Sequence, residues 1–221
     1  MLKHLTRLFA RSPDTTTTAI ARPRVPVEMH WFAETRLPIV DWEHQGAGDT
    51  VPHDGDAAHA YWDSAAETWL EALRDALGAD YHVTGSDDFL LLSTLEPRPA
   101  QVFLATCQRM RARILRNLGA LADDGGWGRH VVMVFEDPDD YYDYVGHYYP
   151  DGGEYAMSSG MFIQAGYGHF VMPLEQVRAR PAGIGCEAFA VFLRQPVQAV
   201  ADAGFAQAFD VAHRPAEIGS K

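Results

Sequence analysis

A strand-to-helix stretch in the middle of the chain decides the fold: Val131-Val132-Met133-Val134-Phe135-Glu136-Asp137-Pro138-Asp139-Asp140-Tyr141. Its first five residues are all apolar, which is typical of a strand covered on both faces of a sheet. Aspartates and a proline follow, and they favour the first turn of a helix because the helix dipole is positive there. We therefore expect a strand over residues 130–136 and a short aromatic helix over residues 141–148, half buried and with exposed tyrosines.

Two long helices and a further buried strand are expected before this stretch. Apolar residues recur at helical spacing over residues 56–77, and Gly78 is a suitable stop. Residues 89–95 form a continuous apolar run between two aspartates and a proline, which predicts a buried strand. Residues 99–118 combine an apolar face with a face rich in arginine and glutamine, which predicts the second helix.

The remaining segments give shorter elements. Residues 27–31 favour a first strand, and residues 45–56 favour a loop because they are rich in Gly, Asp and Pro. Two short apolar strands are expected at 161–164 and 168–172, and two helices at 183–194 and 196–211. Because the elements do not alternate as βαβ units, the expected fold class is α+β.

Length and charge limit the classes of protein to which the chain can belong. Its 221 residues, 47% of them hydrophobic, suit one domain with a packed core. We expect that domain over 27–215, in two parts at 27–96 and 97–215, after a basic segment and Thr/Pro-rich linker at 1–26 and before a tail at 216–221. The net charge of −12 argues against nucleic acid and anionic membrane as partners.

Targeting and redox signals are weak. No run approaches the ~20 apolar residues of a membrane span, so no transmembrane segment is expected. Lys3, Arg7 and Arg11 interrupt any apolar core of a secretory signal, and the expected location is therefore the cytoplasm. Cys107 and Cys186 set no disulfide framework and are read as small buried thiols. The oligomeric state stays open.

Two segments beyond the central stretch carry a family resemblance. They are Glu154-Tyr155-Ala156-Met157-Ser158-Ser159-Gly160-Met161-Phe162-Ile163 and Gly166-Tyr167-Gly168-His169-Phe170-Val171-Met172-Pro173. With residues 132–141 they resemble the bacterial gluzincin-like proteins of the peptidase MA-like kind, over roughly residues 101–209. The resemblance implies a zincin-like fold, in which a small mixed β-sheet with an edge strand along a cleft packs against helices. It also implies an active-site helix bearing H-E-x-x-H and, shortly after it, a W-L-x-E-G sequence.

The zinc ligands that the resemblance implies are substituted in this chain. In Gly185-Cys186-Glu187-Ala188-Phe189-Ala190, Cys186 stands at the first histidine and Ala190 at the second. Glu187 keeps the position of the catalytic glutamate as a vestigial general base, and Ala203 replaces the glutamate ligand. Because alanine cannot bind zinc and a catalytic site needs three protein ligands, we expect neither a metal nor another cofactor. Without zinc nothing lowers the pKa of water toward neutrality, so Glu187 alone does not sustain the peptidase reaction.

The resemblance therefore indicates a catalytically inactive protein. We expect a binding or regulatory module that keeps a peptide-type cleft along residues 161–172 and takes a peptide or protein as its partner. The residues expected at this cleft are His169, Tyr167, Met161 and Phe170.

Three alternatives remain open. The first is a hydrolase with altered chemistry, in which Cys186 acts as a nucleophile or an atypical metal site recruits His169. A strand histidine is more often a structural hydrogen-bonding group, which is the second reading of His169. The third is a purely structural protein whose cleft is filled by its own phenylalanines, Phe189, Phe192 and Phe205.

Overall fold

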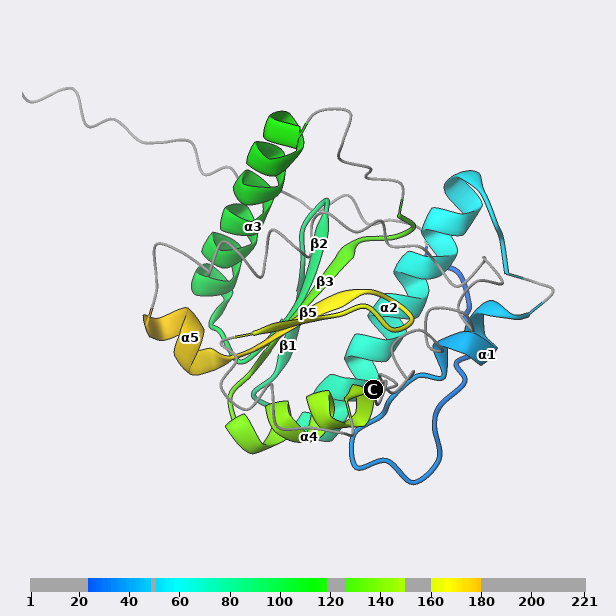
Figure 1. Ribbon diagram of the computed structural model, residues 1–221, viewed down its shortest axis with the longest axis horizontal. Helices are drawn as coiled ribbons and strands as arrows, with labels where there is room; N and C mark the ends of the chain where they lie inside the picture. Colours follow the sequence, from blue (N-terminus) through cyan, green and yellow to red (C-terminus); the bar gives the residue numbers. More distant parts are fainter. Residues whose placement is uncertain (1–23, 49–50, 119–125, 150–159, 180–221) are drawn as a thin grey trace, which may run out of the picture.

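The computed structural model describes residues 24–48, 51–118, 126–149 and 160–179, which form a mixed α+β fold around one five-stranded sheet (Figure 1). Across the sheet the strands are β1 (His82–Gly85), β2 (Phe89–Ser93), β3 (His130–Phe135), β5 (His169–Pro173) and β4 (Met161–Ile163). The three inner strands β2, β3 and β5 are parallel, and each outer strand is antiparallel to its neighbour. The sheet is therefore mixed, as expected, and β4 lies at one edge.

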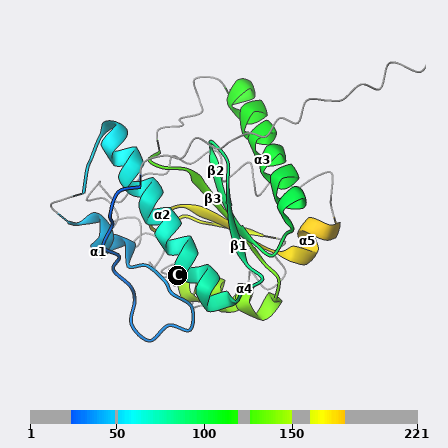
Figure 2. The ribbon, with the colours of Figure 1, turned by 180° about the vertical axis from the view of Figure 1, so that it is seen from behind.

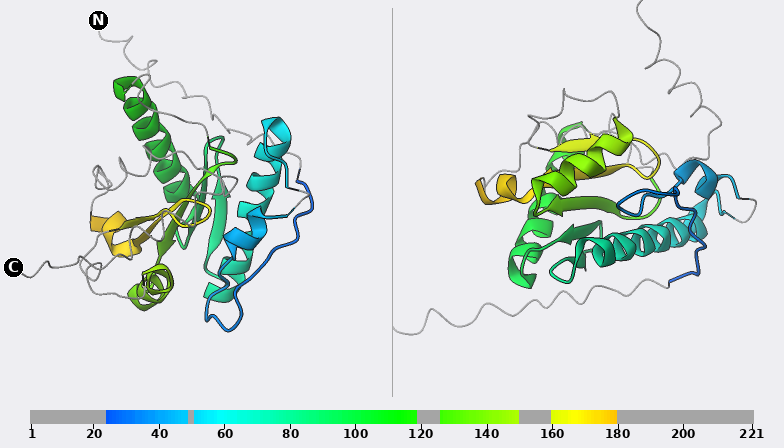
Figure 3. Two further views of the ribbon diagram at one scale, coloured as in Figure 1. Left: turned by 45° about the vertical axis from the view of Figure 1, so that its right-hand side comes forward. Right: turned by 90° about the horizontal axis from the view of Figure 1, so that it is seen from below.

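Helices cover both faces of the sheet. One face packs against α1 (Trp42–Gly46), α2 (Gly55–Leu77) and α4 (Pro138–Tyr148). The other packs against α3 (Pro97–Leu118) and α5 (Leu174–Ala179). Figures 2 and 3 show α2 and α3 on opposite sides of the strands. The described residues therefore form three layers, with the sheet in the middle.

The central strand β3 shows why its sequence is apolar throughout. Val131 and Met133 face the core beneath α2, whereas Val132 and Val134 face the core beneath α3. Successive side chains of a strand point to opposite faces, and both faces of this strand are covered. The prediction of a buried strand here is confirmed.

The predicted helices are also confirmed in their described parts. Helix α2 ends at Gly78, whose φ of 125° is accessible to glycine and whose N–H donates to the carbonyl of Arg74. Helix α4 begins after Asp137, whose carboxylate accepts from the backbone N–H of Asp139. The buried Tyr144 and the exposed Tyr142 match the expected half-buried aromatic helix.

The strand predicted at residues 27–31 is wrong. Only an isolated bridge between Trp31 and Val40 forms there. The N–H of His30 donates instead to the side chain of Gln45, at 3.0 Å. Side chains and turns thus satisfy this backbone, and the segment does not join the sheet.

Three short elements lie where none was expected. Helix α1 runs into the start of the loop predicted at 45–56, β1 precedes the strand predicted at 89–95, and α5 directly follows β5. The predicted helices at 183–194 and 196–211, the segment 1–23 and the tail lie outside the described residues. Strands from both expected parts of the domain share the sheet. None of the described helices has both the length and the apolar character needed to cross a membrane.

Candidate functional site

The edge strand β4 is the part of the expected cleft that the structure describes. It pairs with β5, with Met161 opposite Val171 and Ile163 opposite His169. Among the described residues β4 has no second strand neighbour. Its outer edge therefore presents backbone groups that no described strand pairs.

Two side chains of β4 reach the surface. Met161 and Phe162 are half buried, whereas Ile163 is fully buried. Met161 contacts the core beneath α2, and Phe162 contacts the core beneath α3. The edge thus offers one accessible apolar side chain on each face of the sheet, at the alternation of a strand.

The turn between β4 and β5 is held against α1. Gly166 has a φ of 66°, and a Cβ atom at this position would overlap the side chain of Trp42. The Trp42 ring in turn packs against Tyr167, with ring centroids 5.5 Å apart, and edge-on against Trp69 at 5.1 Å. Glycine is required here because the backbone both adopts a left-handed conformation and approaches an indole ring. This contact fixes the position of the β4–β5 hairpin.

His169 is fully buried, and each of its ring nitrogens has a partner. Nδ1 lies 2.7 Å from the carbonyl oxygen of Tyr167, and Nε2 lies 2.8 Å from the hydroxyl of Tyr144. A carbonyl only accepts, so Nδ1 donates, and in the neutral ring Nε2 accepts the proton of the Tyr144 hydroxyl. Burial lowers the pKa of His169 to about 4, so the ring is neutral at physiological pH.

The surroundings of His169 are also neutral. Burial raises the pKa of Tyr144 well above its usual value and that of Tyr148 to about 12. Their hydroxyls lie 3.4 Å apart, and the ring of Trp69 stands edge-on to His169 at 4.9 Å. This cluster holds no ionised acid or base near pH 7. Its arrangement matches a structural histidine better than a ligand or a catalytic base.

Of the other three residues expected at the cleft, two lie in the core and one is partly exposed. Tyr167 and Phe170 are buried, and the Tyr167 hydroxyl donates to the backbone carbonyl of Arg129 at 2.5 Å. Met161 is the one member of the expected set that is partly exposed. Sequence reasoning missed its neighbour Phe162, which the alternation of the strand would have identified.

The vestigial catalytic positions lie elsewhere in the chain. Cys186, Glu187, Ala190 and Ala203 fall outside the described residues, so their roles stay predictions. Within the part of the chain that the structure describes, no three His, Cys, Asp or Glu side chains are grouped so as to hold a metal ion.

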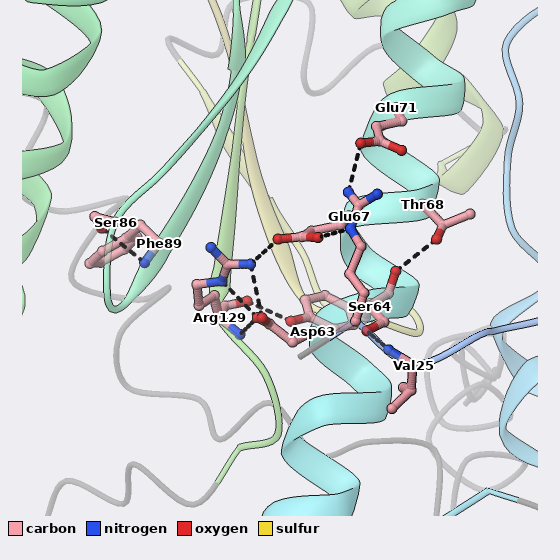
Figure 4. A network of polar contacts seen from close by, with 11 residues as sticks. Val25, Asp63, Ser64, Glu67, Thr68, Glu71, Ser86, Phe89 and Arg129 are labelled. Atoms are coloured by element: carbon pink, nitrogen blue, oxygen red, sulfur yellow. Dashed lines mark hydrogen bonds and ion pairs between the residues drawn. The ribbon is translucent and has the colours of Figure 1, made fainter. Parts of the chain in front are cut away.

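A buried ion pair that the sequence did not suggest joins α2 to Arg129, the residue directly before β3 (Figure 4). Nε and Nη2 of Arg129 donate to the two oxygens of Asp63 at 2.7 and 2.8 Å, and Nη2 also contacts Glu67. Arg24 extends the network by bonding Glu67 and Glu71. One sequence signal could have indicated this pair. Asp63 stands among the apolar positions of the predicted helix, and a carboxylate that is buried there needs a partner because unpaired buried charges are rare. The network fixes α2 against the start of β3, and both carboxylate oxygens of Asp63 accept from Arg129.

A half-open pocket of about 180 Å³ lies between residues 35–39 and α4. Its polar wall includes Arg36, Asp143 and His147, and burial lowers the pKa of His147. Arg36 is already paired, at 2.5 Å with Asp140 and at 2.7 Å with Asp143. None of the four residues expected at the cleft lines this pocket, so it is a separate feature of the surface.

No protein-family model, curated protein or solved structure matches the chain. The resemblance to the gluzincin-like proteins therefore stays a prediction.

Proposed function

We propose that the chain is a catalytically inactive, metal-free relative of the gluzincin peptidases, with a zincin-like fold, that binds an extended peptide or protein segment along β4. The observation that supports this proposal is the place of β4 at the edge of the mixed sheet, antiparallel to β5. An added strand can pair with such an edge through its main chain and place alternate side chains on the two faces. A cytoplasmic location belongs to the same proposal.

The expected affinity follows from the length of the edge. A strand of three residues exchanges about two or three main-chain hydrogen bonds, each contributing about 1 kcal/mol. That sum does not offset the cost of association, which is at least about 4 kcal/mol. Contacts with Met161 and Phe162 must supply the remainder, so the partner should carry apolar side chains on both faces of its strand.

The residue types at the expected ligand positions do not fit zinc. Ala190 and Ala203 have no donor atom, and Cys186 supplies one ligand where three are needed. The alternative, a hydrolase using Cys186 or a metal site recruiting His169, is not favoured by the described residues. Both nitrogens of His169 are already engaged in the core, and a metal would have to displace one of its partners.

A binding experiment tests the proposal. The probe is a pool of fluorescent peptides of about six residues with Val, Ile or Phe at every second position, the alternation of a strand. We expect binding measured by fluorescence anisotropy, weakened at least about fivefold by Phe162→Ser, because truncation removes an apolar contact worth about 1–3 kcal/mol. Mass spectrometry should recover the bound peptides uncleaved.

Val102→Ser is the matched control, since Val102 is an exposed apolar residue on α3, away from β4. It should leave peptide affinity unchanged, and thermal unfolding should show that both variants are folded. Equal loss in the two variants, or no binding by the wild type, would overturn the proposal.

A further inference from the structure

The arginines of α3 form one stripe on the outside of the molecule. Arg98, Arg109, Arg113 and Arg116 are exposed, and at 100° per residue they fall within an arc of roughly 60°. Val102, 59% exposed, lies in the same arc. The opposite side of the helix packs on the sheet through Phe103, Leu104 and Cys107. We call Arg98, Val102, Arg109, Arg113 and Arg116 the arginine stripe; it is roughly 27 Å long.

The stripe is basic on an acidic protein. Helix α3 carries five arginines and no carboxylate, whereas the whole chain has 18 basic and 30 acidic residues. The rest of the chain therefore holds 13 basic residues against 30 acidic ones. Arg111 of the same helix, which is not in the stripe, pairs with Asp88 at 3.6 Å. Among the described residues, no carboxylate pairs with the four arginines of the stripe.

The stripe serves the stability of its own helix only in part. Arg116 stands in the last turn, where the helix dipole favours a cation. Arg98 stands in the first turn, where the helix dipole disfavours a cation. Arg109 and Arg113 are four residues apart and Arg113 and Arg116 three, and like charges at these spacings destabilise a helix. An anionic partner would remove these repulsions.

We propose that the arginine stripe is a docking surface for an acidic segment of another protein, separate from the β4 edge. Guanidinium groups bind carboxylates in a bidentate manner, and arginine is enriched at protein interfaces. A segment with carboxylates at helical or extended spacing can follow a stripe of this length. Val102 provides an apolar contact between Arg98 and the three arginines of the second half of the helix.

Other occupants fit less well. A symmetric dimer through α3 would bring one stripe against its own copy, and the like charges would repel. A nucleic acid carries charge along its whole length and would run from the stripe onto the acidic remainder of the surface. A membrane surface favours large apolar side chains beside the basic ones, and the stripe offers only Val102.

The test uses the full chain and a fluorescent oligoglutamate of about ten residues, which spans roughly 33 Å when extended. Fluorescence anisotropy at about 20 mM salt should show binding that weakens toward about 150 mM, as screening increases. Arg113→Glu should weaken binding roughly tenfold, because it replaces an attraction with a repulsion. The same variant should unfold at the same temperature or higher, since the introduced carboxylate would pair with Arg109 and Arg116. Lost binding therefore cannot be attributed to lost folding.

Arg74→Glu is the matched control, with the same charge change on the opposite side of the sheet. It should leave oligoglutamate affinity within about twofold of the wild type. The proposal is overturned by an equal effect of the two variants, or by no binding of the wild type at low salt. Self-association that depends on Arg113, or tighter stripe-dependent binding of an oligothymidylate or of phosphatidylserine vesicles, would overturn it as well. Phe162→Ser should leave oligoglutamate binding intact, which separates this result from peptide binding at β4.

Discussion

Replacing Asp63 with alanine removes the buried partner of Arg129 and should destabilise the fold strongly. The carboxylate accepts Nε and Nη2 of Arg129 at 2.7 and 2.8 Å and the backbone N–H of the same residue at 3.1 Å. The two side chains are only 5% and 10% exposed, so water does not readily replace the lost bonds. Burial alone would lower the pKa of Arg129, but the hydrogen bonds to Asp63 and Glu67 outweigh this effect and raise the pKa above its usual value. The guanidinium therefore stays charged.

The expected loss follows from leaving a buried charge partly unpaired. Removing one partner of a buried ion pair costs about 3–5 kcal/mol of stability. Because Arg129 keeps its contact with Glu67, we expect Asp63→Ala to lose about 3 kcal/mol. For a chain of this size each kcal/mol lowers the melting temperature by about 2–4 °C. The melting temperature of Asp63→Ala should therefore fall by roughly 6–12 °C.

Urea unfolding followed by far-ultraviolet circular dichroism measures this loss. The double variant Asp63→Leu with Arg129→Met should recover part of it, because an apolar pair leaves no buried charge at these two positions, whereas the backbone N–H of residue 129 still lacks its acceptor. Asp75→Ala is the control, since the exposed Asp75 pairs with Arg74 at the surface and should cost under about 1 kcal/mol. A loss in Asp63→Ala no larger than that in Asp75→Ala would rule out a stabilising role for this ion pair. A double variant that loses as much as Asp63→Leu and Arg129→Met added together would rule it out as well.

Three further predictions concern the core. The contribution of His169 to stability should be complete above pH 6.5 and fall by up to about 3 kcal/mol toward pH 4, because the imidazole takes up a proton in the unfolded chain but stays neutral when buried. His169→Gln should flatten that part of the urea-unfolding profile across pH, and an unchanged slope would contradict the assignment. Gly166→Ala should cost about 2–4 kcal/mol in thermal unfolding because of its overlap with Trp42, against about 1 kcal/mol for Gly55→Ala, which has open space at a similar φ. Burial raises the pKa of Cys107 to about 12, so peptide mass spectrometry should find it labelled by thiol reagents in urea but not in the native protein.

The long periodic and continuous apolar segments were predictable from sequence. Helix α2 and strands β2 and β3 bury residues at the spacing of their own element, so local pattern and tertiary packing agree. The elements that were missed lack this pattern. Strand β1 is mostly half exposed and mixes polar residues, α1 has five residues, and α5 starts immediately after a strand. In these short elements too few residues carry the pattern for periodicity to identify them, and contacts with neighbouring segments complete the structure.

The candidate site was predictable in position but not in detail. The sequence pattern indicated two adjacent short strands at 161–164 and 168–172, and the structure forms both. It could not show that Tyr144 in α4 would occupy one nitrogen of His169, since the two residues meet only through packing. For the same reason the pairing of Asp63 with Arg129, across 66 residues of sequence, had no local signal.

We propose that the scaffold of a zinc peptidase persists in this chain without the residues that would hold its metal. Metal analysis of purified protein after equilibration with zinc tests this proposal. We expect far less than one zinc ion per chain. About one tightly bound zinc ion per chain would contradict it, because a zinc site requires ligands that Ala190 and Ala203 do not provide.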